Sequence, residues 1–218
     1  STLNLWVQGS RWIAAFWSAF SLVYIFCMSA LQRQQLRQQL RHQRRSLSVH
    51  QQQQAAKRVC QRIIKLKAFK KAQRIAFYQA ADGELNPVYL LKLALAYGKH
   101  CYLPMLRRFP KQELAFVRVS KHSRLCKHRF GFKEPKQRPR LFIYQLDMIC
   151  MPLVGFDNRG QRLGMGGGFY DKSLAHYQQK AAFKLGLAHD CQQVKRVPSA
   201  SWDIALNGIL TPTRYIAT

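Results

Sequence analysis

The chain has 218 residues, of which 48% are apolar, and this suits one domain with a sizeable core. Its charge is unusual, because 36 lysines and arginines stand against nine acids and give a formal net charge of +27. A field of that sign attracts polyanions such as nucleotides, acidic cofactors, RNA or a membrane surface, without choosing among them. The six cysteines are scattered with no C-x-x-C pair. Their spacing argues against a disulfide framework and favours a reducing cytoplasm.

The first residues form an apolar stretch with two open interpretations. Residues 11–30, "RWIAAFWSAFSLVYIFCMSA", carry no charge after Arg11 and approach the roughly 20 residues that span a bilayer. Several arginines follow, and they would hold that side of a membrane anchor in the cytoplasm. Alternatively, Met28 opens a sequence typical of the start of a soluble protein. Residues 1–27 would then be an extension from a start codon placed too early, ahead of a single domain at residues 28–218.

The next segments alternate between helical and extended patterns. Residues 31–45 are polar and helix-favouring, with a thin stripe of leucines. Ser48 can cap a second helix that runs through a glutamine tract to about Lys67. The apolar "RIAFYQA" at residues 74–80 predicts a buried strand. Residues 87–98 predict a helix, because proline stands near their start and glycine at their end.

The second half of the chain continues this alternation. Strands are expected at residues 99–104, 114–120, 146–154, 183–189 and 207–211, with a helix at 169–179. The first of these is expected to stop at Pro104. Strands that alternate with helices predict an α/β fold with an open, mostly parallel sheet flanked by helices. Ligands of such sheets bind beyond the carboxyl ends of the strands, where the glycine-rich segment after the strand at 146–154 is expected.

That segment, "RLGMGGGFYD" at residues 162–171, matches neither common phosphate-binding motif. Phe169 stands where the dinucleotide motif needs its third glycine, and Asp171 where a P-loop needs one. Glycines still let backbone N–H groups approach an anion, and Arg162 can donate to a phosphate. Asp171 would repel that phosphate unless Mg²⁺ lay between them. The segment therefore predicts a nucleotide–metal site, and a tight strand-to-helix turn is the alternative.

A second motif has the spacing of metal ligands. His122, Cys126 and His128 lie close together in "KHSRLCKH". A four-ligand zinc site has no obvious further partner in the chain, so a basic surface loop is the preferred interpretation.

The segment "PLVGFDNRGQRLGMGGGFYD", residues 152–171, closely resembles the signature of the 5-formyltetrahydrofolate cyclo-ligases, also called methenyltetrahydrofolate synthetases. Supporting pieces occur in matching order: "RQQLRQQLRHQRRSLS", "IAFYQAADGELNP", "KEP" at residues 133–135 and "VPSASWDIALNGILT". The resemblance covers about residues 31–211. It implies an α/β fold of the sugar-isomerase/CoA-transferase-like type and a reaction that uses ATP and Mg²⁺. That reaction converts 5-formyltetrahydrofolate to 5,10-methenyltetrahydrofolate, ADP and phosphate.

The resemblance also implies site residues by motif position. ATP would contact Arg33, Arg37, Arg162, Gly164, Gly166, Gly167 and Gly168. The folate substrate would contact Gln79, Glu84, Met165, Gly166, Gly167, Gly168, Phe169 and Tyr170. Mg²⁺ would be held by Asp171 and Asp203.

Each of these assignments has a plainer alternative when it is judged from the residues alone. Arg33 and Arg37 could be a solvated helix face, Glu84 a turn residue and Asp203 a helix cap. Asp157 is best interpreted as a turn former. Met165 and Phe169 depart from the residue types that some family members have there, so substrate contacts at these positions are expected to differ in strength.

The partners expected from the sequence follow the same reasoning. The substrate is 5-formyltetrahydrofolate, and its polyglutamylated forms would suit a basic surface. A monomer in the cytoplasm is expected, and contact with a membrane only if residues 11–30 are a real membrane segment. A basic RNA-binding protein without enzymatic activity is the alternative function, although no RNP, KH or zinc-finger motif is present.

Overall fold

The structure is a computed structural model that describes residues 30–106, 114–120, 123, 125–127, 133–135, 140–175, 177 and 182–218. Its main sheet contains β1 (Arg74–Ala76), β2 (His100–Leu106), β3 (Leu114–Val119), β6 (Arg140–Leu141), β7 (Met148–Pro152), β10 (Phe183–Leu187), β11 (Gly208–Leu210) and β12 (Tyr215–Ala217). The strand order is β12-β11-β10-β7-β1-β2-β3-β6. The strands from β11 to β2 are parallel, and β12, β3 and β6 extend the sheet antiparallel at its edges. The prediction of an open, mostly parallel sheet is confirmed, although its antiparallel edge strands β6 and β12 were not foreseen.

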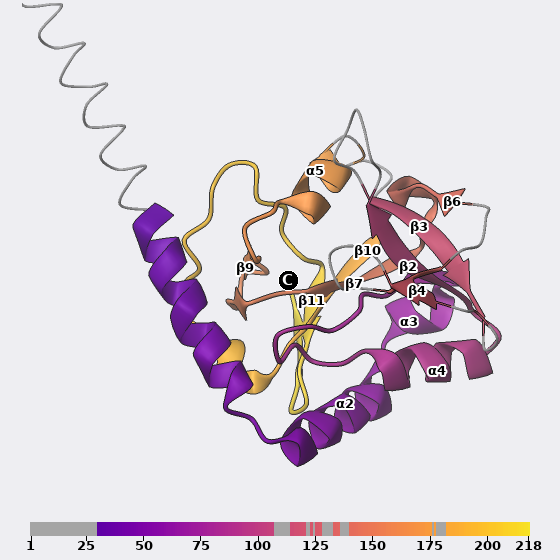
Figure 1. Cartoon of the computed structure of the whole chain (residues 1–218), viewed down its shortest axis with the longest axis horizontal. Coiled ribbons are helices and arrows are strands. Elements are labelled where there is room, and N and C mark those ends of the chain that lie inside the picture. The colour runs from indigo at the N-terminus through magenta and orange to yellow at the C-terminus, as the bar shows by residue number, and fades with distance from the viewer. Residues whose placement is uncertain are drawn as a thin grey trace, which may run out of the picture.

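Helices flank this sheet, as predicted (Figure 1). The described helices are one at residues 30–45, α2 (Val49–Ile63), α3 (Lys67–Lys71), α4 (Val88–Ala96) and α5 (Phe169–Ala175), with short 3₁₀ turns η1 (Ile143–Gln145) and η3 (Asp190–Gln192). Two small hairpins pair β4 (Leu125–Lys127) with β5 (Lys133–Pro135) and β8 (Gly155–Phe156) with β9 (Arg162–Leu163). The 30–45 helix runs along one side of the molecule, and the segment before β11 arches between it and α5 (Figure 1).

The alternation of side chains along the strands builds a core on each face of the sheet. Ile75 and Phe77 pack in one buried cluster with α2 and α4, whereas Ala76 belongs to a second cluster with α5. Both clusters are made of apolar side chains almost wholly removed from water. Burial of that surface on two faces is the main stabilisation of a three-layer α/β domain.

The predicted start of α2 and the predicted end of α4 are confirmed, whereas the predicted end of α2 is wrong. The Ser48 hydroxyl accepts from the Gln51 N–H while the Gln51 side chain accepts from the Ser48 N–H, so the expected cap of α2 is a full capping box. The expected extension of α2 to about Lys67 is wrong, because the helix ends at Ile63 and α3 follows as a separate turn. α4 ends as predicted, with Gly98 in the left-handed region at φ +73°.

Pro104 does not end its strand. β2 continues to Leu106 and pairs with β3 from Cys101 to Leu106, while its pairing with β1 stops at Tyr102. Pro104 therefore lies where β1 is no longer alongside, and its missing N–H removes no bond to that strand. A proline is tolerated there because the neighbouring parallel strand is short.

Several strands are shorter than their apolar patterns. The segment expected at 74–80 is a strand only over Arg74–Ala76, and the one expected at 146–154 only over Met148–Pro152. The residues that continue these patterns beyond β1 and β7 belong to irregular segments at the carboxyl edge of the sheet, and residues 146–147 precede β7. Tyr78, Ala80 and Leu153 among them line a cavity, whereas Phe77 and Val154 are buried in apolar clusters, so their apolar character reflects burial rather than strand pairing.

Two sequence interpretations fall on parts of the chain that the structure does not describe. Residues 1–27 and most of the apolar stretch at 11–30 lie outside the described residues, as do His122 and His128. Cys126 belongs to the short strand β4, whereas a loop was expected there. Among the helices that the structure describes, none combines the length and the apolar character needed to cross a bilayer.

Candidate functional site

The strand order places a crevice beside β1. The chain runs from β1 to β2 on one side, and later adds β7 on the other side of β1. Segments that leave β1 and β7 at their carboxyl ends therefore diverge, and open α/β sheets bind ligands at such a point. Two adjacent pockets occupy this edge, and the glycine-rich segment lies between them.

The first pocket is mainly apolar and has a volume of about 610 Å³. Its lining comes from the segment after β1, from the carboxyl end of β7 and from the glycine-rich segment. The predicted substrate residues that line it are Gln79, Glu84, Met165, Gly167, Gly168, Phe169 and Tyr170. Met165 and Phe169 leave 51% and 37% of their surface exposed, so apolar area in this pocket is available to a ligand.

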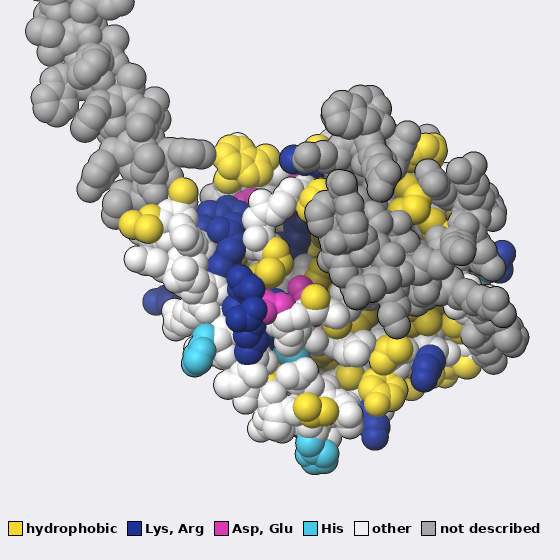
Figure 2. All heavy atoms as spheres, viewed as in Figure 1, with side chains coloured by type: hydrophobic (Ala, Val, Ile, Leu, Met, Phe, Trp, Pro, Cys, Tyr) yellow, Lys and Arg dark blue, Asp and Glu magenta, His cyan; other side chains and the backbone are white. Residues whose placement is uncertain are grey.

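The second pocket is basic and has a volume of about 780 Å³. Basic side chains gather along the 30–45 helix beside a hollow in the surface (Figure 2). The predicted ATP and metal residues that line it are Arg33, Arg37, Arg162, Gly164, Gly166, Gly167, Gly168, Asp171 and Asp203. The structure therefore brings together, around one cavity, residues that are up to 170 positions apart.

The two pockets share a wall built from the glycine-rich segment. Arg162, Gly164, Gly167, Gly168 and Asp171 line both cavities. Gly166, which was expected to contact both ligands, lines only the second pocket among the two. Its φ is +107°, and that of Gly168 is +63°, so this wall has a backbone shape that other residues rarely adopt.

An ion pair fixes the ends of this wall. Arg162 Nη2 donates to Asp171 Oδ1 at 2.8 Å, and Arg162 Nη1 donates to the Ile204 carbonyl at 2.5 Å. The Ile204 N–H donates to the same Asp171 oxygen at 3.1 Å. Arg162 is only 4% exposed, so β9, α5 and the segment before β11 are tied together in a largely dry environment.

Two arginines of the 30–45 helix face this wall. Arg33 Nη1 donates to Asp203 Oδ2 at 2.5 Å and to the Pro198 carbonyl at 2.9 Å. Arg37 Nε donates to the Gly164 carbonyl at 2.8 Å. Burial, and then the charge of Arg33, lower the pKa of Arg37 against the opposing effect of Asp203. An anion bound between the two arginines would relieve their mutual repulsion.

The Asp203 carboxylate is held as an anion. Burial acts to raise its pKa, but hydrogen bonds from Arg33 and the Ala200 N–H, with the charges of Arg33 and Arg162, lower it overall. Asp203 and Asp171 are the acids of the second pocket. The described residues include no group of three or more His, Cys, Asp or Glu that could hold a metal without other ligands.

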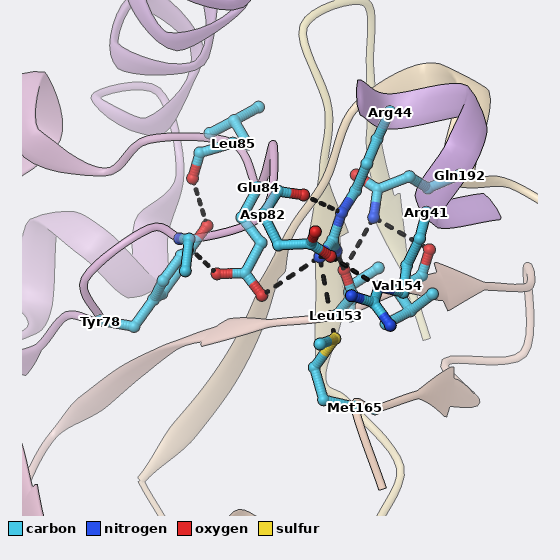
Figure 3. Close-up of polar contacts among 12 residues, drawn as sticks. Arg41, Arg44, Tyr78, Asp82, Glu84, Leu85, Leu153, Val154, Met165 and Gln192 are labelled. Carbon is cyan, nitrogen blue, oxygen red and sulfur yellow. Dashed lines mark hydrogen bonds and ion pairs between the residues drawn. The ribbon is translucent and has the colours of Figure 1, made fainter. Parts of the chain in front are cut away.

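Glu84 is the acid of the first pocket. Its side chain is 9% exposed, its Oε2 accepts from the Ala81 N–H at 3.1 Å, and its Oε1 lies 3.7 Å from Arg44 (Figure 3). Burial raises its pKa, opposed by the Ala81 bond and the Arg44 charge. Tyr78 donates its hydroxyl to the Leu85 carbonyl at 2.5 Å beneath this turn.

Several lining residues were not singled out from the sequence. Tyr78, Pro104 and Pro152 line the first pocket, and Lys172 and Trp202 line the second. Tyr78 and Pro152 lie at or just beyond the carboxyl end of a strand, and that position is the signal that could have identified them. Asp157 is a turn former, as expected, because its side chain accepts from the N–H groups two and four residues later.

A family model and two known proteins with similar sequences carry the same name. The sequence model of the 5-formyltetrahydrofolate cyclo-ligase family matches residues 29–212. A 5-formyltetrahydrofolate cyclo-ligase of Haemophilus influenzae is 40% identical over 185 residues, covering 84% of this chain and 99% of that relative. One from Escherichia coli is 38% identical over 177 residues, covering 80% and 97%.

Solved structures point the same way. A 5,10-methenyltetrahydrofolate synthetase from Aquifex aeolicus matches with a TM-score of 0.74 and 29% identity, over 85% of this chain and 92% of that one. Another, from Mycoplasma pneumoniae, has a TM-score of 0.62 at 22% identity and bears on the fold alone. None of these four proteins is named as RNA-binding, so they give that alternative no support. With its sheet, its glycine-rich wall and near-complete coverage of these relatives, the chain belongs to the 5-formyltetrahydrofolate cyclo-ligase family.

Proposed function

We propose that this chain uses ATP to convert 5-formyltetrahydrofolate to 5,10-methenyltetrahydrofolate, with release of ADP and phosphate. Membership of the family supports the reaction. The observation that carries it here is the pair of pockets, one apolar with a carboxylate and one lined by arginines, which meet at a shared glycine-rich wall. Two substrates held in those pockets would present their reacting groups to each other at that wall.

The second pocket is assigned to the nucleotide. Arg33, Arg37 and Arg162 offer guanidinium donors that suit phosphate oxygens, and the glycines let the phosphates approach the backbone closely. Among the described residues that line this pocket, Trp202 alone carries an aromatic ring, and 60% of its surface is exposed. We assign that ring to the adenine base, because an exposed aromatic face stacks well on a heterocycle.

The first pocket is assigned to the folate. The pterin ring presents N–H and amino donors, which suit the Glu84 carboxylate and the Gln79 side chain. Phe169, Tyr170 and Met165 would cover the apolar faces of the substrate. Closure of the new ring needs the formyl group and N10 held in one orientation, and a largely apolar pocket with few polar anchors supplies that positioning.

The second pocket also suits Mg²⁺ that is shared with phosphate. Mg²⁺ is usually bound by one or two carboxylates together with phosphates and waters, so Asp171 and Asp203 on one pocket fit such an ion. Both described hydrogen bonds of Asp171 end on Oδ1, and we assign its Oδ2 to the metal. When bound, the ion would neutralise phosphate charge.

The protein's own residues position the two substrates and neutralise the charge that develops between them. Attack of the formyl oxygen on the γ-phosphate joins the two ligands at the shared wall, and Arg162, which lines both pockets, would stabilise the charge that develops there. In that attack the bond between the γ-phosphorus and the oxygen that bridges it to the β-phosphate breaks, and ADP leaves. N10 then attacks the activated formyl carbon and loses its proton to solvent, and phosphate leaves as the ring closes. Arg37 holds the Gly164 carbonyl and so fixes the wall on the side of the nucleotide.

Each of the predicted site residues lines at least one of the two pockets, so one chain carries the whole candidate site, and we propose that it acts as a monomer. Scattered cysteines without paired spacing support a cytoplasmic location. The excess of basic residues supports capture of polyglutamylated folates, whose tails are polyanions.

The test follows the absorbance of methenyltetrahydrofolate after 5-formyltetrahydrofolate and Mg-ATP are mixed with the protein. Wild type is expected to turn over, and Asp171→Ala and Arg162→Ala to lose about 100-fold or more of kcat/KM because phosphate and metal contacts are removed. Arg74→Gln is the matched control, since Arg74 is 46% exposed and pairs with Asp147, which lines neither pocket. A wild type without turnover under these conditions refutes the proposal.

A further inference from the structure

Arg44 is a fully buried arginine that neither pocket exposes. Its side chain is 0% exposed, although it belongs to the same helix as Arg33 and Arg37, which line the second pocket. Burial of a guanidinium is costly unless its donors are matched by acceptors. Burial also lowers the pKa of Arg44, which the charge of Glu84 opposes.

The N–H donors of Arg44 reach acceptors on three different segments of the chain. Nε donates to the Asp82 carbonyl at 2.8 Å, and Nη2 donates to the Asp82 carboxylate at 2.7 Å. Nη1 donates to the Leu153 carbonyl, just after β7, at 3.2 Å. Nη2 also lies 3.7 Å from Glu84 and 3.8 Å from the Met165 sulfur. Arg44 thus points from its helix into the space between the Asp82–Glu84 turn, Leu153 and Met165 (Figure 3).

The segments that Arg44 touches are those that build the first pocket. Glu84, Leu153 and Met165 all line that cavity. Asp82 has φ +54°, a conformation that non-glycine residues seldom adopt, so the turn that carries Glu84 depends on its surroundings to keep its shape. A single buried group therefore contacts the acid, the apolar side chain and the backbone on three sides of the pocket.

We propose that Arg44 is a positioning residue that holds Glu84 and Met165 in place for the folate and links the nucleotide-binding helix to the folate pocket. This rests on the function proposed above. The charge of Arg44 lowers the pKa of Glu84 against burial, and so favours the ionised acceptor that pterin donors need. Tyr78 also faces Glu84, and its hydroxyl is committed to Leu85.

A comparison with Arg41 and Arg45 distinguishes the proposed role of Arg44 from a simple ion pair with Asp82. Both contact the Asp82 carboxylate from the same helix, but their side chains are 34% and 55% exposed. The contacts described for them do not include Glu84, Leu153 or Met165. Arg45→Gln is therefore a matched control: it removes one cation from Asp82 and leaves the pocket contacts of Arg44 in place.

The experiment measures kcat and both KM values for Arg44→Gln, Arg44→Lys and Arg45→Gln, with thermal unfolding of each. Loss of the ion pair with Glu84 and of the hydrogen bonds to its turn predicts that Arg44→Gln raises the KM for 5-formyltetrahydrofolate about 10- to 100-fold. The KM for ATP should change by less than about threefold, because Arg33 and Arg37 are untouched. Arg45→Gln should leave both KM values within about twofold, as expected for an exposed ion pair.

Arg44→Lys guards against a failure of Arg44→Gln to fold. An ammonium keeps the charge but cannot hold the separated acceptors of a guanidinium fork, so its KM for the folate should rise about threefold to tenfold. A wild-type folate KM in Arg44→Lys overturns the proposal, and so does an Arg44→Gln that raises both KM values equally. If wild type itself shows no turnover, the proposed function fails instead, and the two failures are distinct.

A second arm tests whether Arg44 acts through Glu84. The effects of Arg44→Gln and Glu84→Gln on the KM for the folate should be less than multiplicative in the double variant, because part of the effect of Arg44 passes through Glu84. The contacts of Arg44 with Met165 and Leu153 account for the effect that remains. Independent effects that multiply in the double variant would overturn the assignment of Arg44 to Glu84.

Discussion

The acids near the two pockets are each held by arginine. Asp171 pairs with Arg162 and Asp203 with Arg33. Asp82 receives several arginines from the 30–45 helix. In a chain of net charge +27, acids are scarce, and removing one leaves a partly buried cation without its partner. Substitution of these acids is therefore expected to damage positioning as well as any direct contact with ligands.

At the residue scale, the assignment of Trp202 gives a direct prediction. Trp202→Ala removes the aromatic surface of the nucleotide pocket, and loss of one base–aromatic stack of about 1–3 kcal/mol should raise the KM for ATP roughly 5- to 150-fold. Trp202→Phe is the control, because a smaller ring keeps part of the stack. Steady-state kinetics with varied ATP measure both, and equal KM values for ATP in Trp202→Ala and wild type would assign the base elsewhere.

His189 gives a prediction for stability against pH. It is 2% exposed, and its Nε2 has no hydrogen-bond partner among the described residues. Burial first, and then the charge of Arg44, lower its pKa to about 4, against the opposing Gly83 bond and Asp190 charge. The unfolded chain, with its ordinary histidine pKa, binds the proton more readily between those values, so the free energy of unfolding falls as pH falls below about 6.5.

By pH 5 this histidine should cost about 2 kcal/mol relative to pH 7. The measurement is chemical denaturation at both pH values for wild type and His189→Gln, which cannot titrate. The loss of stability between pH 7 and pH 5 should be smaller in the variant by about that amount. Parallel losses in the two proteins would show that His189 does not titrate in this way.

At the scale of elements, helix ends follow local chemistry closely. Ser48 caps α2 with Gln51, and Gly98 ends α4, where its N–H donates to the Leu95 carbonyl while the Lys99 N–H donates to the Ala94 carbonyl. These features depend on neighbouring residues alone, which is why the sequence predicts them. The ends of β1, β2 and β7 depend instead on how long their neighbours run, and apolar patterns misplace them.

Gly98 supplies the prediction for an element. Gly98→Ala should lower the free energy of unfolding by about 1 kcal/mol, because a side chain at φ +73° is strained. A new methyl group meets no atom within 4 Å, so a clash does not contribute. Gly98→Asn should recover part of the loss, since asparagine tolerates this region better than alanine. Denaturant unfolding tests the order Gly, Asn, Ala, and any other order contradicts the strain argument.

At the scale of the whole molecule, the basic residues far outnumber the acids that could pair with them, so the protein has a strong positive electrostatic field. Basic side chains follow the 30–45 helix beside the hollow in the surface (Figure 2). An anionic tail on the substrate would meet this field before it enters the pocket, and such long-range attraction is screened by salt.

The field therefore predicts a difference between two forms of the substrate. Raising NaCl from about 50 to about 300 mM should increase the KM for a polyglutamylated folate several-fold more than the KM for the monoglutamate. The monoglutamate is the internal control, because both forms use the same pocket contacts. Equal salt dependence of the two KM values would show that the positive field does not contribute to capture of the substrate.

The sequence by itself determined the class of the fold, the helix caps and the family, because these depend on periodicity, on neighbouring residues and on a contiguous motif. It also identified the candidate site residues, but it did not show how they are arranged around the site. Only the tertiary structure decided that Gly164, Gly167 and Gly168 form a wall between two cavities, and that Arg44 is buried against Asp82 and Glu84. The physical reason is distance along the chain: contacts between a helix at 30–45 and segments up to 170 residues later depend on sheet order and packing, which no local pattern encodes.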